Sequence, residues 1–103
     1  MPNLYAGAVP DPAAERCTDL LTRPGLRIER IVSSGQSSPP GFWYDQAQSE
    51  WVLLLRGEAS ISFEGEAAPR RLQAGDFLDI AARRRHRVEA TAADTLWLAV
   101  HYD

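Results

Sequence analysis

Short strand-like segments separated by turn-forming residues dominate the sequence after Pro24 and leave little room for helices. No helical periodicity competes with them in this part of the chain. Many short strands at regular spacing are typical of an antiparallel sandwich or barrel. The sequence therefore predicts an all-β domain. The segments expected as strands are Leu26–Val32, Phe42–Asp45, Trp51–Leu55, Ala59–Phe63, Arg70–Leu72, Phe77–Ile80, His86–Ala90 and Thr95–His101.

The first 25 residues have a different character. Met1 to Pro10 carries no regular pattern and is expected to form an arm. Asp11 followed by Pro12 is a typical helix start, with the aspartate as N-cap and the proline at the first helical position. The next residues, AAERCTDLL, then give about two helical turns before Pro24-Gly25. We expect an arm or short helix over residues 1–25 and a barrel over residues 26–103.

Composition excludes several classes of function. A chain of 103 residues is long enough for one hydrophobic core, and its net charge of -3 gives no basic surface for nucleic acid. No apolar run reaches the roughly 20 residues needed to cross a bilayer, and the N-terminus does not resemble a secretory signal. Cys17 is the only cysteine, so an internal disulfide is impossible. We expect a cytoplasmic protein with neither nucleic-acid nor membrane partners.

A carboxylate stands directly before the most apolar strand. Glu50 precedes the run Trp51–Leu55, which leads to Gly57. A glutamate in this position either lies in water at the end of the strand or points into the core. Because an unpaired ionised carboxylate in a core is very costly, the inward position requires a metal ion or another cation as partner.

Two spacings in the sequence resemble the motifs of the cupin superfamily. Glu50 stands seven residues before Gly57, and the pair Gly75-Asp76 is followed by His86, eleven residues after the glycine. The first spacing resembles the end of the first cupin motif, and the second spacing resembles the second motif. The chain is most similar to small single-domain cupins of the conserved-barrel type. This resemblance implies a double-stranded β-helix, the jelly-roll barrel, with a pocket lined by both motifs.

The resemblance also implies a divalent metal, with Fe, Mn, Ni and Zn as candidates. Glu50 and His86 occupy ligand positions of the motifs. The usual histidine pair before the glutamate is missing, and Tyr44 with Gln46, or Trp43 with Asp45, takes its place. We expect Asp45 or Gln46 to supply an oxygen ligand, and prefer Asp45 because an anion binds a divalent cation more strongly. A metal-free pairing of Glu50 with His86 is the alternative.

His101 is a further candidate, as a ligand of the pocket or as a general base. If residues 91–94 form a hairpin loop, His86 pairs with Ala99 and His101 lies on the same face, one diagonal step away. A slip of one residue instead turns Leu96, Leu98 and Val100 inward, and burial of apolar surface favours that slip. Tyr44 is expected to line the pocket. Arg83, Arg84 and Arg85 are expected to form a solvated loop, with an anionic substrate at the pocket mouth as the alternative.

Three functions remain open at this point. The first is a metal-dependent enzyme of the oxygenase, isomerase or lyase class that acts on a small molecule, with Glu50 or His101 as the proton-transferring group. The second is a metal-free barrel that binds or senses a small molecule without catalysis. The third is a purely structural barrel that forms a homodimer. Homodimerisation is compatible with all three, and the barrel edges and the N-terminal arm are its expected surfaces.

Overall fold

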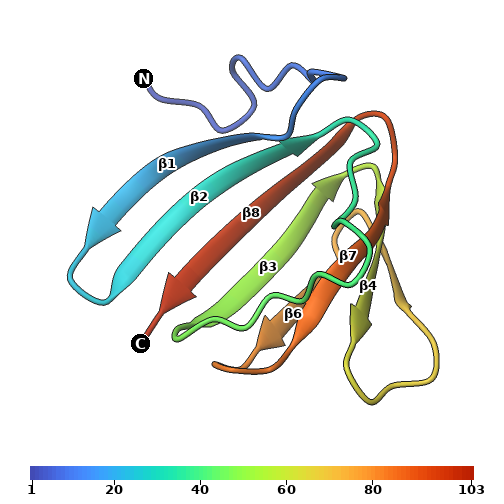
Figure 1. The fold of residues 1–103 in the computed structure, drawn as a ribbon. Helices are drawn as coiled ribbons and strands as arrows, with labels where there is room; N and C mark the ends of the chain where they lie inside the picture. Colours follow the sequence, from blue (N-terminus) through green and yellow to red (C-terminus); the bar gives the residue numbers. More distant parts are fainter.

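The computed structural model describes residues 1–103 and consists of strands joined by turns and loops, without a helix. Two antiparallel sheets form a double-stranded β-helix (Figure 1). The five-stranded sheet has the order β1-β2-β8-β3-β6, and the three-stranded sheet has the order β5-β4-β7. The strands are β1 (Arg16–Arg23), β2 (Leu26–Ser33), β3 (Ser49–Arg56), β4 (Glu58–Phe63), β5 (Arg70–Gln73), β6 (Phe77–Ile80), β7 (His86–Thr91) and β8 (Thr95–Tyr102).

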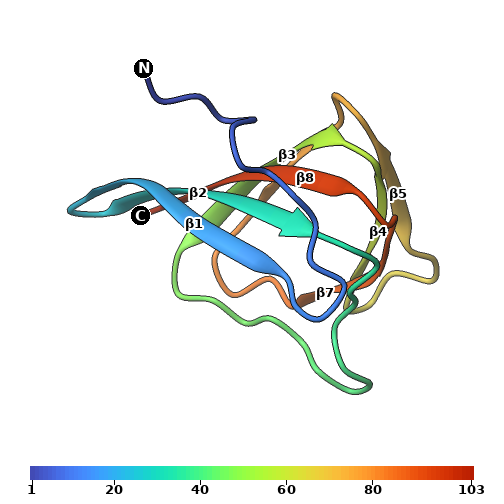
Figure 2. The same cartoon turned by 90° about the horizontal axis from the view of Figure 1, so that it is seen from above.

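The main hydrophobic core lies between the two sheets. Seen from above, β4, β5 and β7 close one side of the barrel, and the β1–β2 hairpin extends away on the other side (Figure 2). Alternate residues of each strand point inward, as the period of two requires. The core residues are Val52, Leu54, Ala59, Ile61, Phe63, Leu72, Ile80, Trp97 and Ala99. Because this cluster fills one end of the barrel, the interior beyond it is left for polar side chains.

The predicted N-terminal helix is wrong, because most of its residues form strand β1. Asp11 does act as a local cap: its Oδ1 accepts a hydrogen bond from the amide of Ala13 at 2.9 Å. The chain then turns out of this short loop and pairs with β2 from Arg16↔Val32 to Arg23↔Leu26. A two-turn helix has little stability of its own, whereas the free edge of β2 offers a full ladder of backbone hydrogen bonds.

The N-terminal arm crosses the end of the five-stranded sheet (Figure 1). The Arg30 guanidinium donates to the carbonyls of Leu4 at 3.0 Å and Ala6 at 2.7 Å, and Arg56 donates to the carbonyl of Ala8 at 3.1 Å. Ala8 packs on a second small cluster with Val32 and Leu96. The arm therefore covers the outer face of the sheet at this end only.

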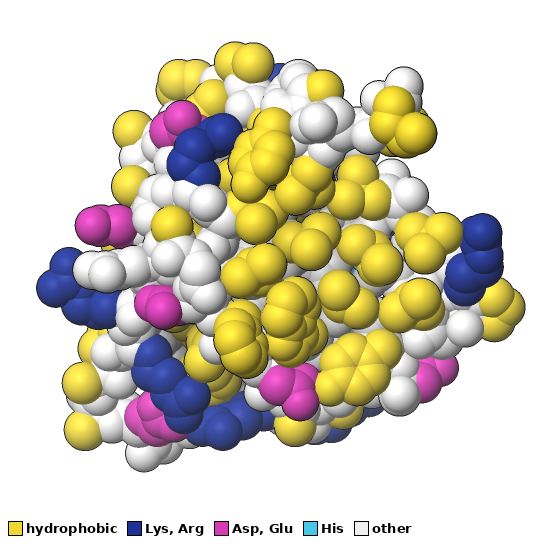
Figure 3. Space-filling view, turned by 180° about the vertical axis from the view of Figure 1, so that it is seen from behind, with side chains coloured by type: hydrophobic (Ala, Val, Ile, Leu, Met, Phe, Trp, Pro, Cys, Tyr) yellow, Lys and Arg dark blue, Asp and Glu magenta, His cyan; other side chains and the backbone are white.

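The rest of the outer face of this sheet is apolar. Figure 3 shows hydrophobic side chains gathered over the back of the molecule. The register places Leu98 between Arg30 and Leu53, and Val100 between Ile28 and Trp51. An antiparallel sheet with one solvated face normally alternates polar residues on that face. In this sheet the outer face is instead mostly apolar, and Phe77 at its edge remains 63% exposed.

No helix long and apolar enough to cross a membrane occurs in the structure.

The chain passes from one sheet to the other at Gly57, between β3 and β4. Gly57 has a φ of 89°, and a Cβ built there would lie 2.5 Å from the carbonyl oxygen of Asp94 and 2.8 Å from the Cα of Thr95. These neighbours are backbone atoms that β8 holds in place. Gly57 is therefore required both for its backbone conformation and for the space beside it.

We expect Gly57→Ala to destabilise the fold much more than Gly65→Ala. Gly65 has the same φ of 89° but no atom within 4 Å of a built Cβ. In both variants the alanine must adopt the left-handed backbone conformation, which lowers the free energy of unfolding by about 1–2 kcal/mol. In Gly57→Ala, overpacking against β8 lowers it by about a further 1–3 kcal/mol. Equilibrium urea unfolding measures both losses. Equal losses for the two variants would show that the close approach to β8 carries no energy.

Candidate functional site

The pairing of β8 with both of its neighbours builds the polar part of the interior. His101 of β8 pairs with Arg27 of β2 on one side and with Glu50 of β3 on the other. Directly opposed residues of adjacent strands point to the same face of a sheet. Glu29 lies two residues from Arg27 on β2, so it shares this face and is one diagonal step from His101. Four chemically active side chains thus meet inside the barrel.

These side chains line an interior cavity of about 160 Å³. Its walls come from both sheets and from the loop before β3. The apolar part of the lining belongs to the core, and the polar part is formed by carboxyl, imidazole, guanidinium, phenol and amide groups. The lining residues are Glu15, Cys17, Arg27, Glu29, Ile31, Tyr44, Gln46, Glu50, Val52, Ile61, Ile80, His86, Val88, Trp97 and His101.

Glu50 is the central group of the cavity. The residue is only 9% exposed, and its carboxylate lies between the two imidazoles. Its Oε1 is 3.5 Å from His86 Nε2, and its Oε2 is 3.7 Å from His101 Nε2. Both distances are longer than a good hydrogen bond, for which 2.7–3.2 Å is usual. The carboxylate is therefore buried between two nitrogen atoms without a short hydrogen bond to either.

Glu29 holds His101 in a hydrogen-bonded pair. His101 Nε2 lies 2.8 Å from Glu29 Oε1, and the Arg27 guanidinium donates to the other oxygen of Glu29 at 2.9 Å. The hydrogen bond from His101 lowers the pKa of Glu29, and the guanidinium of Arg27 adds to this against the opposing effect of burial. Glu29 is thus a carboxylate, and His101 donates its Nε2 proton to it.

His86 is fixed by its backbone neighbour. Its Nδ1 lies 2.8 Å from the carbonyl oxygen of Arg84, and since a carbonyl only accepts, Nδ1 carries a proton. In the neutral imidazole Nε2 is therefore a lone-pair donor that faces Glu50. Burial by itself lowers the pKa of His86, but the Glu50 carboxylate and the Arg84 carbonyl outweigh burial, so the pKa is raised. Tyr44 stacks on the His86 ring with 5.3 Å between centroids.

The residues expected in the pocket do not all reach it. Glu50, His86, Gln46 and Tyr44 line the cavity, whereas Asp45 is absent from its walls. The Asp45 carboxylate is about half exposed and pairs with Arg83 at 3.4 Å. Tyr44 and Asp45 point in different directions because Tyr44 forms a β-bridge with His86. Asp45 thus takes part in a surface ion pair.

His101 reaches the cavity by a different route from the expected hairpin. The pairing of His86 with Ala99 is wrong: β7 pairs with β4 in the three-stranded sheet, while β8 lies between β2 and β3 in the other sheet. His101 is nevertheless buried and faces Glu50. The two histidines are the only ones in the chain, and they approach Glu50 from opposite sheets.

Glu29 and Arg27 were not anticipated from the sequence. In the segment Leu26–Val32 the alternation places Leu26 and Ile28 on one face, with Arg27 and Glu29 on the other. Burial of apolar residues predicts that the charged face is solvated. The structure has the reverse arrangement, with the charged pair inside the barrel. The remaining sequence signal is an arginine and a glutamate two residues apart, which is too common to identify a site.

The donor atoms fit a divalent cation. One ligand atom each from Glu29, Glu50 and His101 lie within 4.8 Å of one another. A divalent ion bound by imidazole nitrogen and carboxylate oxygen at about 2.0–2.2 Å brings its ligands to comparable separations. His86 lies outside this group, across Glu50.

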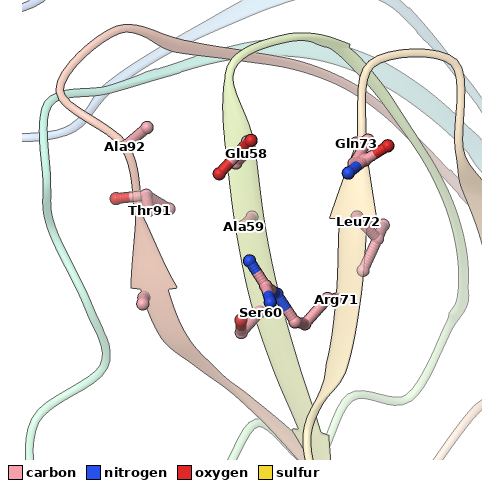
Figure 4. A pocket seen from close by; sticks show the side chains of 9 residues that line it. Glu58, Ala59, Ser60, Arg71, Leu72, Gln73, Thr91 and Ala92 are labelled. Carbon is pink, nitrogen blue, oxygen red and sulfur yellow. The ribbon is translucent and has the colours of Figure 1, made fainter.

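A second hollow lies on the outer face of the three-stranded sheet. It has a volume of about 250 Å³ and is bordered by β4, β5 and the end of β7. Figure 4 shows the side chain of Arg71 extending from β5 over β4, with Glu58 at the other end of the hollow. Its lining contains no histidine or cysteine. The interior cavity is therefore the candidate site.

Comparison with solved structures identifies clear relatives. A protein of Ralstonia eutropha JMP134, provisionally named a mannose-6-phosphate isomerase, is 50% identical, with a TM-score of 0.95 over 100% of this chain and 97% of that one. A cupin superfamily protein of Desulfitobacterium hafniense DCB-2 is 20% identical, with a TM-score of 0.73 over 86% and 77% of the two chains. An RmlC-like cupin of Shewanella frigidimarina NCIMB 400 is 16% identical, with a TM-score of 0.72 over 85% and 75%.

Protein-family models and curated proteins gave no match. The two more distant structures share the fold with this chain. The Ralstonia protein also shares half of its residues over nearly the full length of both chains. The two motif spacings, the double-stranded β-helix and these structural neighbours agree, and the chain belongs to the cupin superfamily.

Proposed function

We propose that the interior cavity is the active site of a metal-dependent enzyme that acts on a small molecule, with isomerisation as the reaction class. The observation that carries this proposal is the buried Glu50 carboxylate, which lies between two imidazoles without a short hydrogen bond. Burying a carboxylate destabilises the fold unless a cation or a hydrogen-bond donor pairs with it. The provisional name of the 50% identical Ralstonia protein favours an isomerase over an oxygenase or a lyase.

Glu29, Glu50 and His101 would hold the ion, for which Fe, Mn, Ni and Zn are the candidates given these oxygen and nitrogen donors. A bound ion would polarise a carbonyl oxygen of the substrate as a Lewis acid. Isomerisation of a hydroxycarbonyl compound also needs a base that takes a proton from one carbon and returns it to the next. His86 suits this role because its Nδ1 is held by the Arg84 carbonyl, which leaves Nε2 facing the cavity beside Glu50.

Reconstitution tests the metal part of this proposal. After removal of bound ions with a chelator, we expect the protein to take up about one equivalent of Mn²⁺ or Zn²⁺ per chain. Glu50→Gln keeps the shape of the side chain but removes its charge, and should weaken metal binding by at least about 10- to 100-fold. Elemental analysis and calorimetric titration measure the stoichiometry and the affinity.

Asp45→Asn is the matched control, because Asp45 is the neighbouring carboxylate that the structure places outside the cavity. It should bind metal like the wild type. Folding of each variant is checked by circular dichroism. Failure of the wild-type protein to bind any of the four ions, or unchanged affinity in Glu50→Gln, would contradict the metal site and leave a metal-free binding cavity.

The raised pKa of His86 predicts how stability depends on pH. A group whose pKa is higher in the folded state stabilises the fold at low pH. The contribution of His86 is therefore complete below its unfolded pKa of about 6.5 and disappears as the pH rises through its folded pKa. The difference in unfolding free energy between wild type and His86→Gln, measured by urea unfolding with a chelator present, should shrink over this interval. A difference that grows with pH would contradict the charge pairing of His86 with Glu50.

We also propose that a second copy of this chain covers the apolar outer face of the five-stranded sheet. The centre of this face is formed by Leu98, Leu53, Val100 and Trp51. Beside them, Arg30 donates to the arm carbonyls, and Asp79 accepts a hydrogen bond from Tyr102 at 2.5 Å. Two such faces can meet about a two-fold axis with their apolar centres in contact. An exposed apolar area of this kind marks an interaction surface.

Sedimentation tests this assembly. We expect the wild type to sediment as a dimer and Leu98→Asp, which places a charge in the centre of the face, to sediment as a monomer. Ser62→Asp introduces the same charge on the outer face of β4 and should remain dimeric. A monomeric wild type would contradict the dimer, and a dimer that survives Leu98→Asp would place the contact elsewhere.

A further inference from the structure

We infer that the interior cavity selects uncharged, hydroxyl-bearing molecules and rejects phosphorylated ones. This inference rests on the proposal that the cavity is the substrate site, and it specifies the class of substrate. It departs from the phosphosugar in the provisional name of the Ralstonia relative. The evidence is the balance of charges in the lining and the absence of a free anion-binding group among them.

Carboxyl groups outnumber guanidinium groups around the cavity. Three carboxyl groups line it, those of Glu15, Glu29 and Glu50, against one guanidinium, that of Arg27. A phosphate monoester carries between 1.5 and 2 negative charges at neutral pH by the usual second pKa of about 6. Like charges brought together in a partly dry site are costly, by several kcal/mol in protein interfaces. Without a bound metal ion, these charges oppose an anionic ligand. A divalent ion held by Glu29 and Glu50 would offset the carboxylates, but it would be engaged with the carbonyl oxygen of the substrate and would leave a phosphate without a cation of its own.

The single guanidinium is already paired with two carboxylates. Arg27 Nη1 lies 2.9 Å from Glu29 Oε2 and 3.3 Å from Asp19 Oδ1. These two carboxylates offset the charge of Arg27, so a phosphate would gain little attraction there, and drawing Arg27 away would cost Glu29 one of the two groups that hold it. Arg27 therefore serves to position Glu29.

No other arginine reaches the cavity. The three arginines before β7 are engaged with carboxylates outside the cavity: Arg83 with Asp45, Arg84 with Glu66 and Arg85 with Glu64. The anionic substrate considered for these arginines therefore has no free partner there. The fold also contains no helix, so the positively polarised helix N-terminus that commonly binds phosphate is absent.

The hydrogen-bonding groups that remain free match hydroxyl groups. The carboxylate of Glu50 is an acceptor without a short hydrogen bond. Burial, with the carboxylates of Glu15 and Glu50 nearby, raises the pKa of Tyr44, so its phenol keeps a proton to donate. The amide of Gln46 adds one acceptor and two donors beside it. A neutral polyol offers both donors and acceptors to such a set, with no charge to desolvate.

Matched ligands test the inference directly. Mannose and mannose 6-phosphate differ only in the phosphate group, and mannitol is the neutral, open-chain polyol obtained by reducing mannose. Each is titrated into the protein, metal-free and Zn²⁺-loaded, while NMR follows the ring signals of His86 and His101, which report occupancy of the cavity. In the metal-free protein we expect mannose or mannitol to shift both ring signals, and mannose 6-phosphate to bind about tenfold or more weakly. In Glu15→Gln this discrimination should fall, whereas in Glu58→Gln, outside the cavity, it should not change.

Equal or tighter binding of mannose 6-phosphate would overturn the charge selection. Ring signals that respond to neither neutral sugar would overturn the assignment of a polyol ligand. Neither result depends on the metal site, since the metal-free titration is read separately. Conversely, failure to bind any metal would contradict the proposed function, while the metal-free titration would still decide whether the cavity discriminates by charge.

Discussion

The position of β8 between β2 and β3 determines the chemistry of this molecule. One ladder aligns Arg27 with His101 and the other aligns His101 with Glu50. Because the period of a strand is two, shifting β8 by one residue would turn His101 outward and leave Glu50 and Glu29 buried without it. The register is fixed by burial of Trp97 and Ala99 on the same face as His101. The hydrophobic core and the polar site thus specify the same alignment.

Hydrogen bonds hold two groups of polar side chains in the cavity, one on each side of Glu50. Arg27 holds Glu29, which in turn holds His101, and the Arg84 carbonyl holds His86. Glu50 lies between the two histidines and has the weakest contacts of the set. Such an arrangement orients every group except the one at the centre. We regard this as preorganisation for a ligand that binds Glu50.

The sequence predicted the barrel and the two motif positions, but it did not determine which faces of β2 and β8 point inward. Glu50 and His86 could be identified because their spacings to Gly57 and Gly75 are local features. Glu29 could not, because the rule that apolar residues face inward fails on β2, where Ile28 faces outward. The same rule fails on β8, where Leu98 and Val100 face outward and His101 faces the cavity. Both failures have one physical cause, the apolar outer face of the sheet.

The N-terminal error has a different origin. The signals at Asp11 and Pro12 are local and do produce a turn, but the fate of the following residues depends on an unpaired strand edge that lies elsewhere in the chain. Asp45 likewise could not be placed, because the strand expected for residues 42–45 is reduced to the single bridge between Tyr44 and His86. Long-range pairing decided both cases.

The central claim is that Glu29, Glu50 and His101 form one cation site inside the barrel. The most direct measurement is anomalous diffraction from crystals of the protein loaded with Mn²⁺ or Zn²⁺. The account predicts one strong peak at about 2.0–2.2 Å from a donor atom of each of these three residues, with the Glu29–His101 hydrogen bond replaced. A peak held by His86 and Gln46 instead, or no peak in the cavity, would contradict it.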